Sequence, residues 1–140
     1  MSLISCIVKF LLLVTFCEAM TMKQIRQTGK MMRKSCQPKN NVEDEKIDVL
    51  ADGVFIEEKE VMCYIACIMK MASAIKNGKL NVEAALKQVD LLLPEDLKEP
   101  AKAAIIACRK VSESYKDICE ASFHTTKCIY NENPEIFFFP

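Results

Sequence analysis

This 140-residue chain has no net charge, few glycines and one histidine, and each of these limits the functions that it can have. Its 19 Lys and Arg residues balance its 19 Asp and Glu residues. Nucleic-acid binding and docking on an anionic membrane both need a basic face, so this balance argues against both. Only three glycines occur, and no Asn-Gly or Asp-Gly pair separates two alternating apolar runs. Because strands and hairpins need such patterns, we expect an all-α protein without strands.

The single histidine, His124, and the lack of catalytic motifs argue against an enzyme. The sequence has no Cys-x-x-Cys pair, no phosphate-binding loop and no Gly-x-Ser-x-Gly motif. A catalytic histidine would need a nucleophile or an oriented carboxylate, and no motif supplies one. We therefore expect no catalytic residue, no cofactor and no metal site, and we expect His124 to be structural. An alternative is that charging of His124 in mild acid loosens the end of the chain and releases a ligand.

Residues 1–19 have the pattern of a secretory signal peptide. The stretch from Leu3 to Phe16 is apolar apart from three residues, and it is too short for a comfortable membrane span. The small residues Cys17 and Ala19 fit a cleavage site, which we place after Ala19. An N-terminal membrane anchor is the alternative. We expect a secreted, extracellular protein without membrane insertion, with one domain at 20–140 that ends in a C-terminal tail at 131–140.

Six of the eight cysteines remain after such a cleavage, in an oxidising compartment. An even number of cysteines in a secreted chain predicts disulfides, here three. Cys63 and Cys67 lie four residues apart in a helical stretch, so their side chains point the same way along one face. They are badly placed to bond each other, and each needs a different partner. The residues alone leave those partners open among Cys36, Cys108, Cys119 and Cys128.

Helical periodicity, capping residues and helix breakers predict six short helices. The third predicted helix is apolar nearly all round, which places it at the centre of the domain. Pro100 either kinks the fifth helix or begins it. The predicted boundaries are the capping box Thr21-Met-Lys-Gln24, the caps Asn41, Asn81 and Asp117, and the stops Pro38, Gly53, Asn77-Gly78 and Pro94. The predicted helices cover 21–36, 41–53, 57–76, 81–93, 94 to about 111, and 117 to about 130.

The spacing of the six cysteines is the most specific feature of the chain. Between consecutive cysteines from Cys36 to Cys128 lie 26, 3, 40, 10 and 8 residues. This pattern resembles the six-cysteine insect odorant-binding proteins, which have three residues between the second and third cysteines and eight between the fifth and sixth. Local segments are similar to the fly alcohol- and pheromone-binding members: Met62-Cys-Tyr64, Lys127-Cys128, and an aromatic end that closes on a proline.

The resemblance implies six helices stapled by three interlocked disulfides around a hydrophobic cavity, with the pairs Cys36–Cys67, Cys63–Cys119 and Cys108–Cys128. It implies a secreted carrier, in sensory lymph or another body fluid, that binds odorants, pheromones or other volatile or lipid-like molecules and releases them near an olfactory receptor. A homodimer is a further partner to consider. The alternative is a secreted interaction protein with a packed core, which presents its surface to a receptor or protease.

Candidate wall residues come from the apolar helical stripes and from matches to pocket positions of the family. Methionine side chains suit a surface that adapts to varied apolar ligands. The chain ends in Ile136–Pro140 (the terminal segment), of which Ile136–Phe139 is too apolar to stay in water, so this part packs on the domain, enters a cavity or makes an oligomer contact. The resemblance implies that its three phenylalanines form a pocket wall. Met69 and Ala74 match the positions where family members hold an alcohol with Ser or Thr, which favours longer, more apolar ligands. The candidates are Met32, Met69, Ala72, Ser73 (the nearest hydroxyl), Ile75, Leu86, Leu92, Ile129, Phe137, Phe138 and Phe139.

Overall fold

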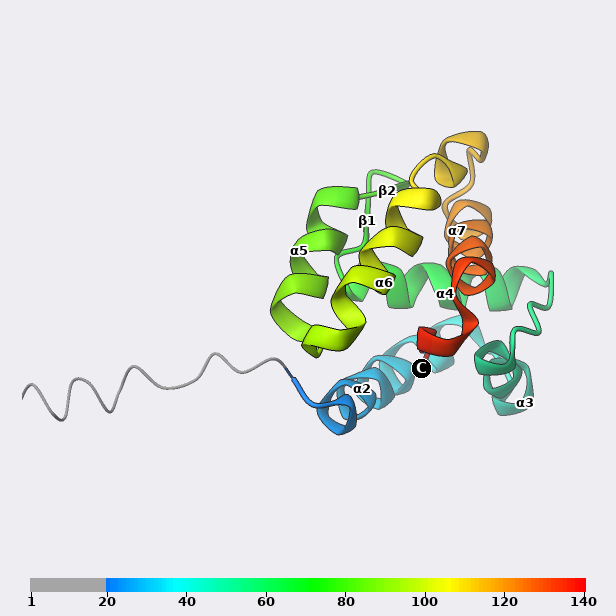
Figure 1. Ribbon diagram of the computed structural model, residues 1–140. Helices are drawn as coiled ribbons and strands as arrows, with labels where there is room; N and C mark the ends of the chain where they lie inside the picture. The colour runs from blue at the N-terminus through cyan, green and yellow to red at the C-terminus, as the bar shows by residue number, and fades with distance from the viewer. Residues whose placement is uncertain (1–19) are drawn as a thin grey trace, which may run out of the picture.

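The computed structural model describes residues 20–140, and their fold is all-α, as predicted from the sequence (Figure 1). The proposed signal peptide, with Cys6 and Cys17, lies outside the described residues. The described α-helices are α2 (Met22–Asn40), α3 (Asp44–Asp48), α4 (Lys59–Met71), α5 (Val82–Leu92), α6 (Glu95–Ala107) and α7 (Ile118–Glu132). Three 3₁₀ turns, η1 (Val49–Asp52), η2 (Val111–Ser114) and η3 (Pro134–Ile136), and two short strands complete the described part. None of its helices is both long and apolar enough to span a membrane.

Three helices begin at the capping residues that the sequence predicts. Thr21 Oγ1 accepts the amide N–H of Gln24, and the Gln24 side chain accepts the N–H of Thr21 at 2.8 Å, so the capping box is formed. The Asn81 side chain accepts an N–H in the first turn of α5, and Asp117 accepts two in the first turn of α7. These bonds satisfy amide donors that the first turn of a helix otherwise leaves free.

Two predicted boundaries near the end of α2 were wrong. The helix continues through Pro38 to Asn40, since a proline near the last turn removes only one hydrogen bond and its neighbours keep their helical geometry. Asn41 adopts a left-handed conformation, with a φ of 52°, and closes α2 instead of capping the next helix. Glu43 is the N-cap of α3.

The position of Pro100, which the sequence left open, is settled: it lies inside α6 rather than at its first position.

The short segment after α3 follows the prediction in part. Gly53 adopts the left-handed conformation, with a φ of 79°, that ends η1. Ile47 and Leu50 are buried, whereas Ala51 is exposed. A Cβ on Gly53 would also clash with the ring of Tyr130, at 2.3 Å, so this glycine lets α7 approach closely.

The predicted central helix ends five residues early, at Met71, and a small hairpin follows it. Strand β1 (Ile75–Lys76) pairs antiparallel with β2 (Lys79–Leu80), so the expectation of a chain without strands was wrong. Asn77 and Gly78 both have positive φ and form the turn, where a two-residue hairpin needs this geometry. Strands of two residues are too short to show an alternating pattern, so the sequence gives no signal for them.

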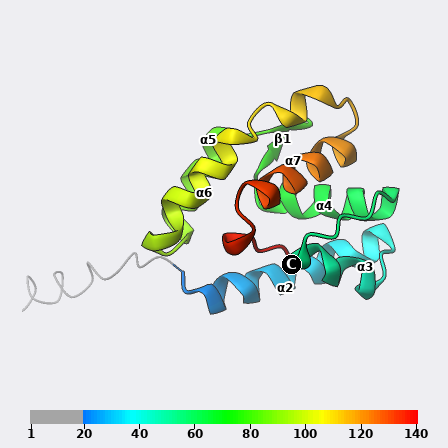
Figure 2. The same cartoon turned by 45° about the vertical axis from the view of Figure 1, so that its right-hand side comes forward.

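Helix α4 lies at the centre of the domain, between α2 and α7 (Figure 2). Its apolar residues on nearly every side make this burial favourable, as predicted. The main core gathers around it, and the largest fully buried side chains there are Tyr64, Phe123, Leu50, Ile65 and Val61.

Helices α5 and α6 form an antiparallel pair that stands to one side of the other helices (Figure 2). This pair, the α5–α6 hairpin, has its own small cluster of buried side chains: Ala85, Val89 and Ile105. Lys102 on α6 binds Asp90 on α5 with a 2.5 Å ion pair. The α5–α6 hairpin meets the rest of the domain mainly through α6, which packs against α7 and η3.

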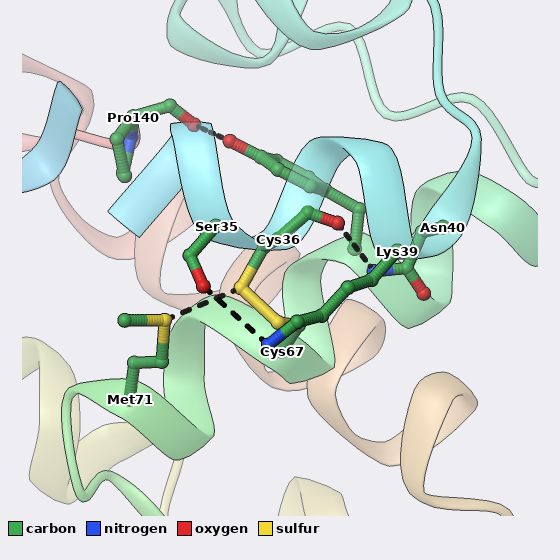
Figure 3. The surroundings of a disulfide bond; sticks show 8 residues. Ser35, Cys36, Lys39, Asn40, Cys67, Met71 and Pro140 are labelled. Carbon is green, nitrogen blue, oxygen red and sulfur yellow. Dashed lines mark hydrogen bonds between the residues drawn. A yellow bond between two sulfur atoms is a disulfide. The ribbon is translucent and has the colours of Figure 1, made fainter. Parts of the chain in front are cut away.

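Three disulfides join these helices in the pairing that the resemblance implies. Cys36–Cys67 links α2 to α4, Cys63–Cys119 links α4 to α7, and Cys108–Cys128 links the end of α6 to α7. Cys63 and Cys67 serve different partners, as their shared helix face requires. Figure 3 shows the first bridge, with the Met71 sulfur 3.5 Å from Cys36 Sγ.

Candidate functional site

The terminal segment runs back into the domain between α7 and α2 (Figures 1 and 2). Its last main-chain oxygen, on Pro140, accepts a hydrogen bond from the hydroxyl of Tyr64 on α4 (Figure 3). Tyr64 is fully buried, and this burial raises the pKa of its hydroxyl, which therefore stays protonated and able to donate. The end of the chain is thus fixed to the central helix.

Each phenylalanine of the terminal segment packs against a different part of the domain. Phe137 joins an aromatic cluster, with ring centroids 5.1 Å from Tyr130 and 6.3 Å from Phe55. Phe139 packs edge-on against Tyr64 at 6.4 Å and contacts the main core. Phe138 lies over α2, between these two anchors, where it faces the space described below.

Gly29 in the middle of α2 makes room for Phe138. A Cβ at this position would lie 2.8 Å from the Phe138 ring and 3.0 Å from Pro140. A glycine inside a helix costs about 1 kcal/mol relative to alanine, so a structural reason for it is expected. The close approach of the terminal segment supplies that reason.

Two adjoining cavities lie between the terminal segment, α2, α4 and the α5–α6 hairpin. One has a volume of about 250 Å³ and the other about 350 Å³. They are neighbours because they share six wall residues: Ile25, Met69, Leu93, Ile105, Phe138 and Phe139. The first extends toward α7 and η3 through Thr126, Ile129 and Ile136, and the second extends along α2 and α5 through Met32, Ala85 and Val89.

Most of the candidate wall residues line these cavities. Those that do are Met32, Met69, Ala72, Leu92, Ile129, Phe137, Phe138 and Phe139. Three do not: Ser73 is exposed just after α4, with a φ of 54°, Ile75 lies in the main core, and Leu86 packs into the hairpin cluster. Ala74, one of the two positions matched to family hydroxyls, does line the second cavity together with Met69.

Sequence reasoning missed part of the wall. The missed residues include Ile25, Leu93, Leu97, Ala101 and Ile105, all on stripes whose helical period was clear. The periodicity shows that a stripe is buried, but it does not show whether the stripe faces a packed core or a cavity. Thr126 was missed for another reason, since a single threonine carries no periodic signal.

The cavity walls are almost entirely apolar. Among the described residues that line the two cavities there is no Asp, Glu, Lys, Arg or His. A buried charge on a ligand would therefore have no partner, which disfavours charged ligands strongly. Such walls suit a neutral, mainly hydrocarbon molecule.

Two other clusters contain residue types that can bind a metal or carry a proton. Cys108, Cys128 and Glu132 lie close together, but the two cysteines are joined as a disulfide and have no thiolate to give a metal. His124 stacks on Tyr115 with ring centroids 4.2 Å apart and meets Phe123 edge-on. These contacts fit the structural role expected of this histidine.

An apolar cavity held between cross-linked helices defines a class of small proteins that bind apolar molecules in their interior. Within that class, the PBP/GOBP family model matches residues 18–132, and the chain belongs to this family. The resemblance seen in the cysteine spacing is confirmed.

The relatives agree with this assignment. The chain is similar to general odorant-binding protein 72 of Anopheles gambiae, with 36% identity over 120 residues that cover 86% of this chain and 99% of the relative. Among solved structures it is similar to odorant binding protein 4 of Chrysopa pallens, with 40% identity, a TM-score of 0.80, and coverage of 86% and 99%. Apis mellifera odorant binding protein 5 is 33% identical, with a TM-score of 0.81 and coverage of 88% and 100%.

Proposed function

We propose that this protein is a secreted carrier that binds small hydrophobic molecules, such as odorants or pheromones, in the two adjoining cavities. The observation that carries the proposal is the apolar wall closed on one side by the terminal segment. The family membership and the names of the relatives support it. In the alternative, an interaction protein with a packed core, the interior would be filled, and the two cavities argue against this.

Contact with the apolar walls supplies the favourable part of the binding free energy. Burying one CH₂ group contributes about 0.8 kcal/mol, so ten such groups contribute roughly 8 kcal/mol. A binding free energy of roughly 8 kcal/mol corresponds to a Kd near 1 μM. A carrier with this affinity loads ligand and also releases it.

The setting of the carrier is also part of the proposal. We infer that it works in sensory lymph or another body fluid and releases its ligand near an olfactory receptor. A homodimer remains a prediction to be tested by measuring the oligomeric state. Binding and release are then the whole mechanism, with no chemical step on the ligand.

Displacement of a fluorescent apolar probe tests the proposal on the oxidised protein. Long-chain alcohols, esters and aldehydes should displace the probe at micromolar concentration. No uptake of the probe by the oxidised protein would contradict the carrier function. Deletion of Ile136–Pro140 should weaken binding, because the deletion removes one wall; a change of oligomeric state with unchanged affinity would instead make the segment an interface.

Two neighbouring methionines on α2 provide a matched pair of variants. Met32 lines the second cavity, whereas Met31 is 66% exposed and lines neither cavity. Met32→Ala should weaken ligand binding by about tenfold, since it removes apolar contact from the wall. Met31→Ala should leave the affinity unchanged. Equal effects of the two substitutions would show that the ligand binds elsewhere.

A further inference from the structure

Thr126 on α7 brings a hydroxyl to the wall of the first cavity. The residue is only 3% exposed, so its hydroxyl cannot bond freely to solvent. Its Oγ1 lies 3.2 Å from the sulfur of Met69, which is its hydrogen-bond partner. A thioether sulfur is a weak acceptor, so this buried hydroxyl keeps most of its capacity to bind a better one.

A second threonine, Thr28, has a hydroxyl with a strong hydrogen-bond acceptor and serves as a comparison. Thr28, on the wall of the second cavity, donates to the main-chain oxygen of Gln24 at 3.1 Å and is exposed. The remaining polar wall residues, Gln88 and Asn133, are partly exposed. Among the described wall residues, Thr126 is therefore the one polar side chain that is buried.

Met69 stands at the junction of the two cavities, because it lines both. Its side chain has three rotatable bonds and adapts easily to a new neighbour. A ligand oxygen that takes the place of the Met69 sulfur would satisfy the Thr126 hydroxyl. Because Met69 lines both cavities, the same movement of its side chain would leave more space for the hydrocarbon part of the ligand.

We propose that Thr126 is the specificity-determining residue of the cavity, and that its hydroxyl binds the oxygen of a neutral ligand such as a long-chain ketone, aldehyde, ester or alcohol. The proposal rests on the carrier function proposed above and adds the residue that binds the polar atom of the ligand. The apolar walls hold the carbon chain, and Thr126 holds the single polar atom. The absence of charged wall residues among those described disfavours a carboxylate at this place.

The test compares two probes of equal length, a long-chain methyl ketone and the corresponding alkane, on the full chain with its disulfides formed. Thr126→Val keeps the shape of the side chain and removes the hydroxyl. It should weaken ketone binding by about three- to tenfold, the range of one hydrogen bond, and leave alkane binding unchanged. Thr126→Ser, which keeps the hydroxyl, should retain the preference for the ketone.

Thr125→Val is the matched control. Thr125 is the neighbouring residue on α7, is fully buried and lines neither cavity, so its substitution should change neither affinity. If Thr126→Val lowers both affinities equally, or neither, the proposed role of Thr126 is wrong. If the unmodified protein binds neither probe, the carrier function itself fails, which is a different result.

A second measurement needs no variant. The infrared carbonyl stretch of the bound ketone, labelled with ¹³C at its carbonyl carbon, should lie at lower frequency than the stretch of the same ketone in an alkane solvent, because an accepted hydrogen bond weakens the C=O bond. A bound ketone whose stretch matches that in an alkane solvent would overturn the proposal even if the variants do not fold.

Discussion

The helices around α4 and the α5–α6 hairpin are built very differently. The region around α4 contains the largest buried side chains, such as Tyr64 and Phe123, and two bridges, Cys36–Cys67 and Cys63–Cys119, lie inside it. The hairpin has a cluster of three small or medium side chains, and a single bridge, Cys108–Cys128, ties its end to α7. Exposed large apolar residues do not distinguish the two regions, since Leu91, Leu92 and Ile106 lie in the α5–α6 hairpin and Met31, Val54 and Met71 lie outside it.

The cavities lie where these two regions meet. Met69 and Phe139 belong to the side around α4, whereas Leu92, Leu93 and Ile105 belong to the hairpin. Regions with few buried apolar contacts open at lower free energy than a dense core. We infer that the region around α4 provides most of the stability and that the α5–α6 hairpin opens at lower free energy.

The largest expected effect comes from removing a bridge in the dense region. Replacing both Cys63 and Cys119 with alanine opens a loop of 56 residues, for which the loop-entropy relation gives a loss of about 4 kcal/mol. The midpoint of urea unfolding measures this loss. Replacing Cys108 and Cys128, which are 20 residues apart, should cost about 3 kcal/mol by the same relation.

The two bridge variants should also differ in where they loosen the protein. Amide hydrogen exchange in α5 and α6 should accelerate most when Cys108–Cys128 is removed, because that bridge anchors the hairpin. Uniform acceleration throughout the domain in both variants would contradict the division into two regions.

Two buried valines provide a chemically matched comparison with a smaller expected effect on stability. Val61 on α4 is fully buried in the main core, and Val89 on α5 belongs to the hairpin cluster and lines the second cavity. Val61→Ala should lower the free energy of unfolding by about 2–3 kcal/mol, because it leaves a void in a packed core. Val89→Ala should cost about 1 kcal/mol, since its side chain already borders empty space.

The effects of the two substitutions on ligand affinity should have the opposite order. Val89→Ala alters the cavity wall and should change affinity, whereas Val61→Ala should not. Equal losses of stability, together with equal effects on binding, would show that the two regions form one uniform core.

The sequence predicts well those features that depend on local chemistry. Thr21, Asn81 and Asp117 begin their helices because a side-chain oxygen next to free amides acts within a few residues. The family resemblance predicts the disulfide pairing, which the fold then shows. The error at Pro38 arose because a proline in the last turn of a helix disturbs little.

The cavity was harder to predict because it depends on contacts between distant segments. Leu97 and Ile105 show a clear helical period, yet only the packed fold shows that they face empty space. Ser73 and Ile75 were assigned to the wall on the assumption that α4 continues to residue 76. The helix ends at Met71, so the turn that follows carries both side chains away from the cavity.

The smallest expected effect is a pH dependence at the surface of the region around α4. Arg33 on α2 binds Asp44 and Asp48 on α3 at 2.5 and 2.6 Å. A hydrogen bond from Gln37, followed by the one from Arg33, lowers the pKa of Asp44 below its usual value. Because the folded pKa lies below the unfolded one, the stabilisation is present above the unfolded pKa and is lost as the pH falls through the folded pKa.

Asp44→Asn should therefore flatten the loss of stability between neutral and acid pH. The effect should be small, because Asp44 is exposed to solvent and water screens the pair. The measurement is the urea midpoint at pH 6 and at pH 3, compared between the variant and the unmodified protein. Gln37→Met, which removes the larger cause of the pKa shift and keeps the charge of Asp44, should reproduce part of the flattening. If neither variant changes the acid loss, the stability of the α2–α3 contact does not depend on the Asp44 carboxylate, and the Arg33–Asp48 ion pair and the neighbouring core are sufficient to hold it.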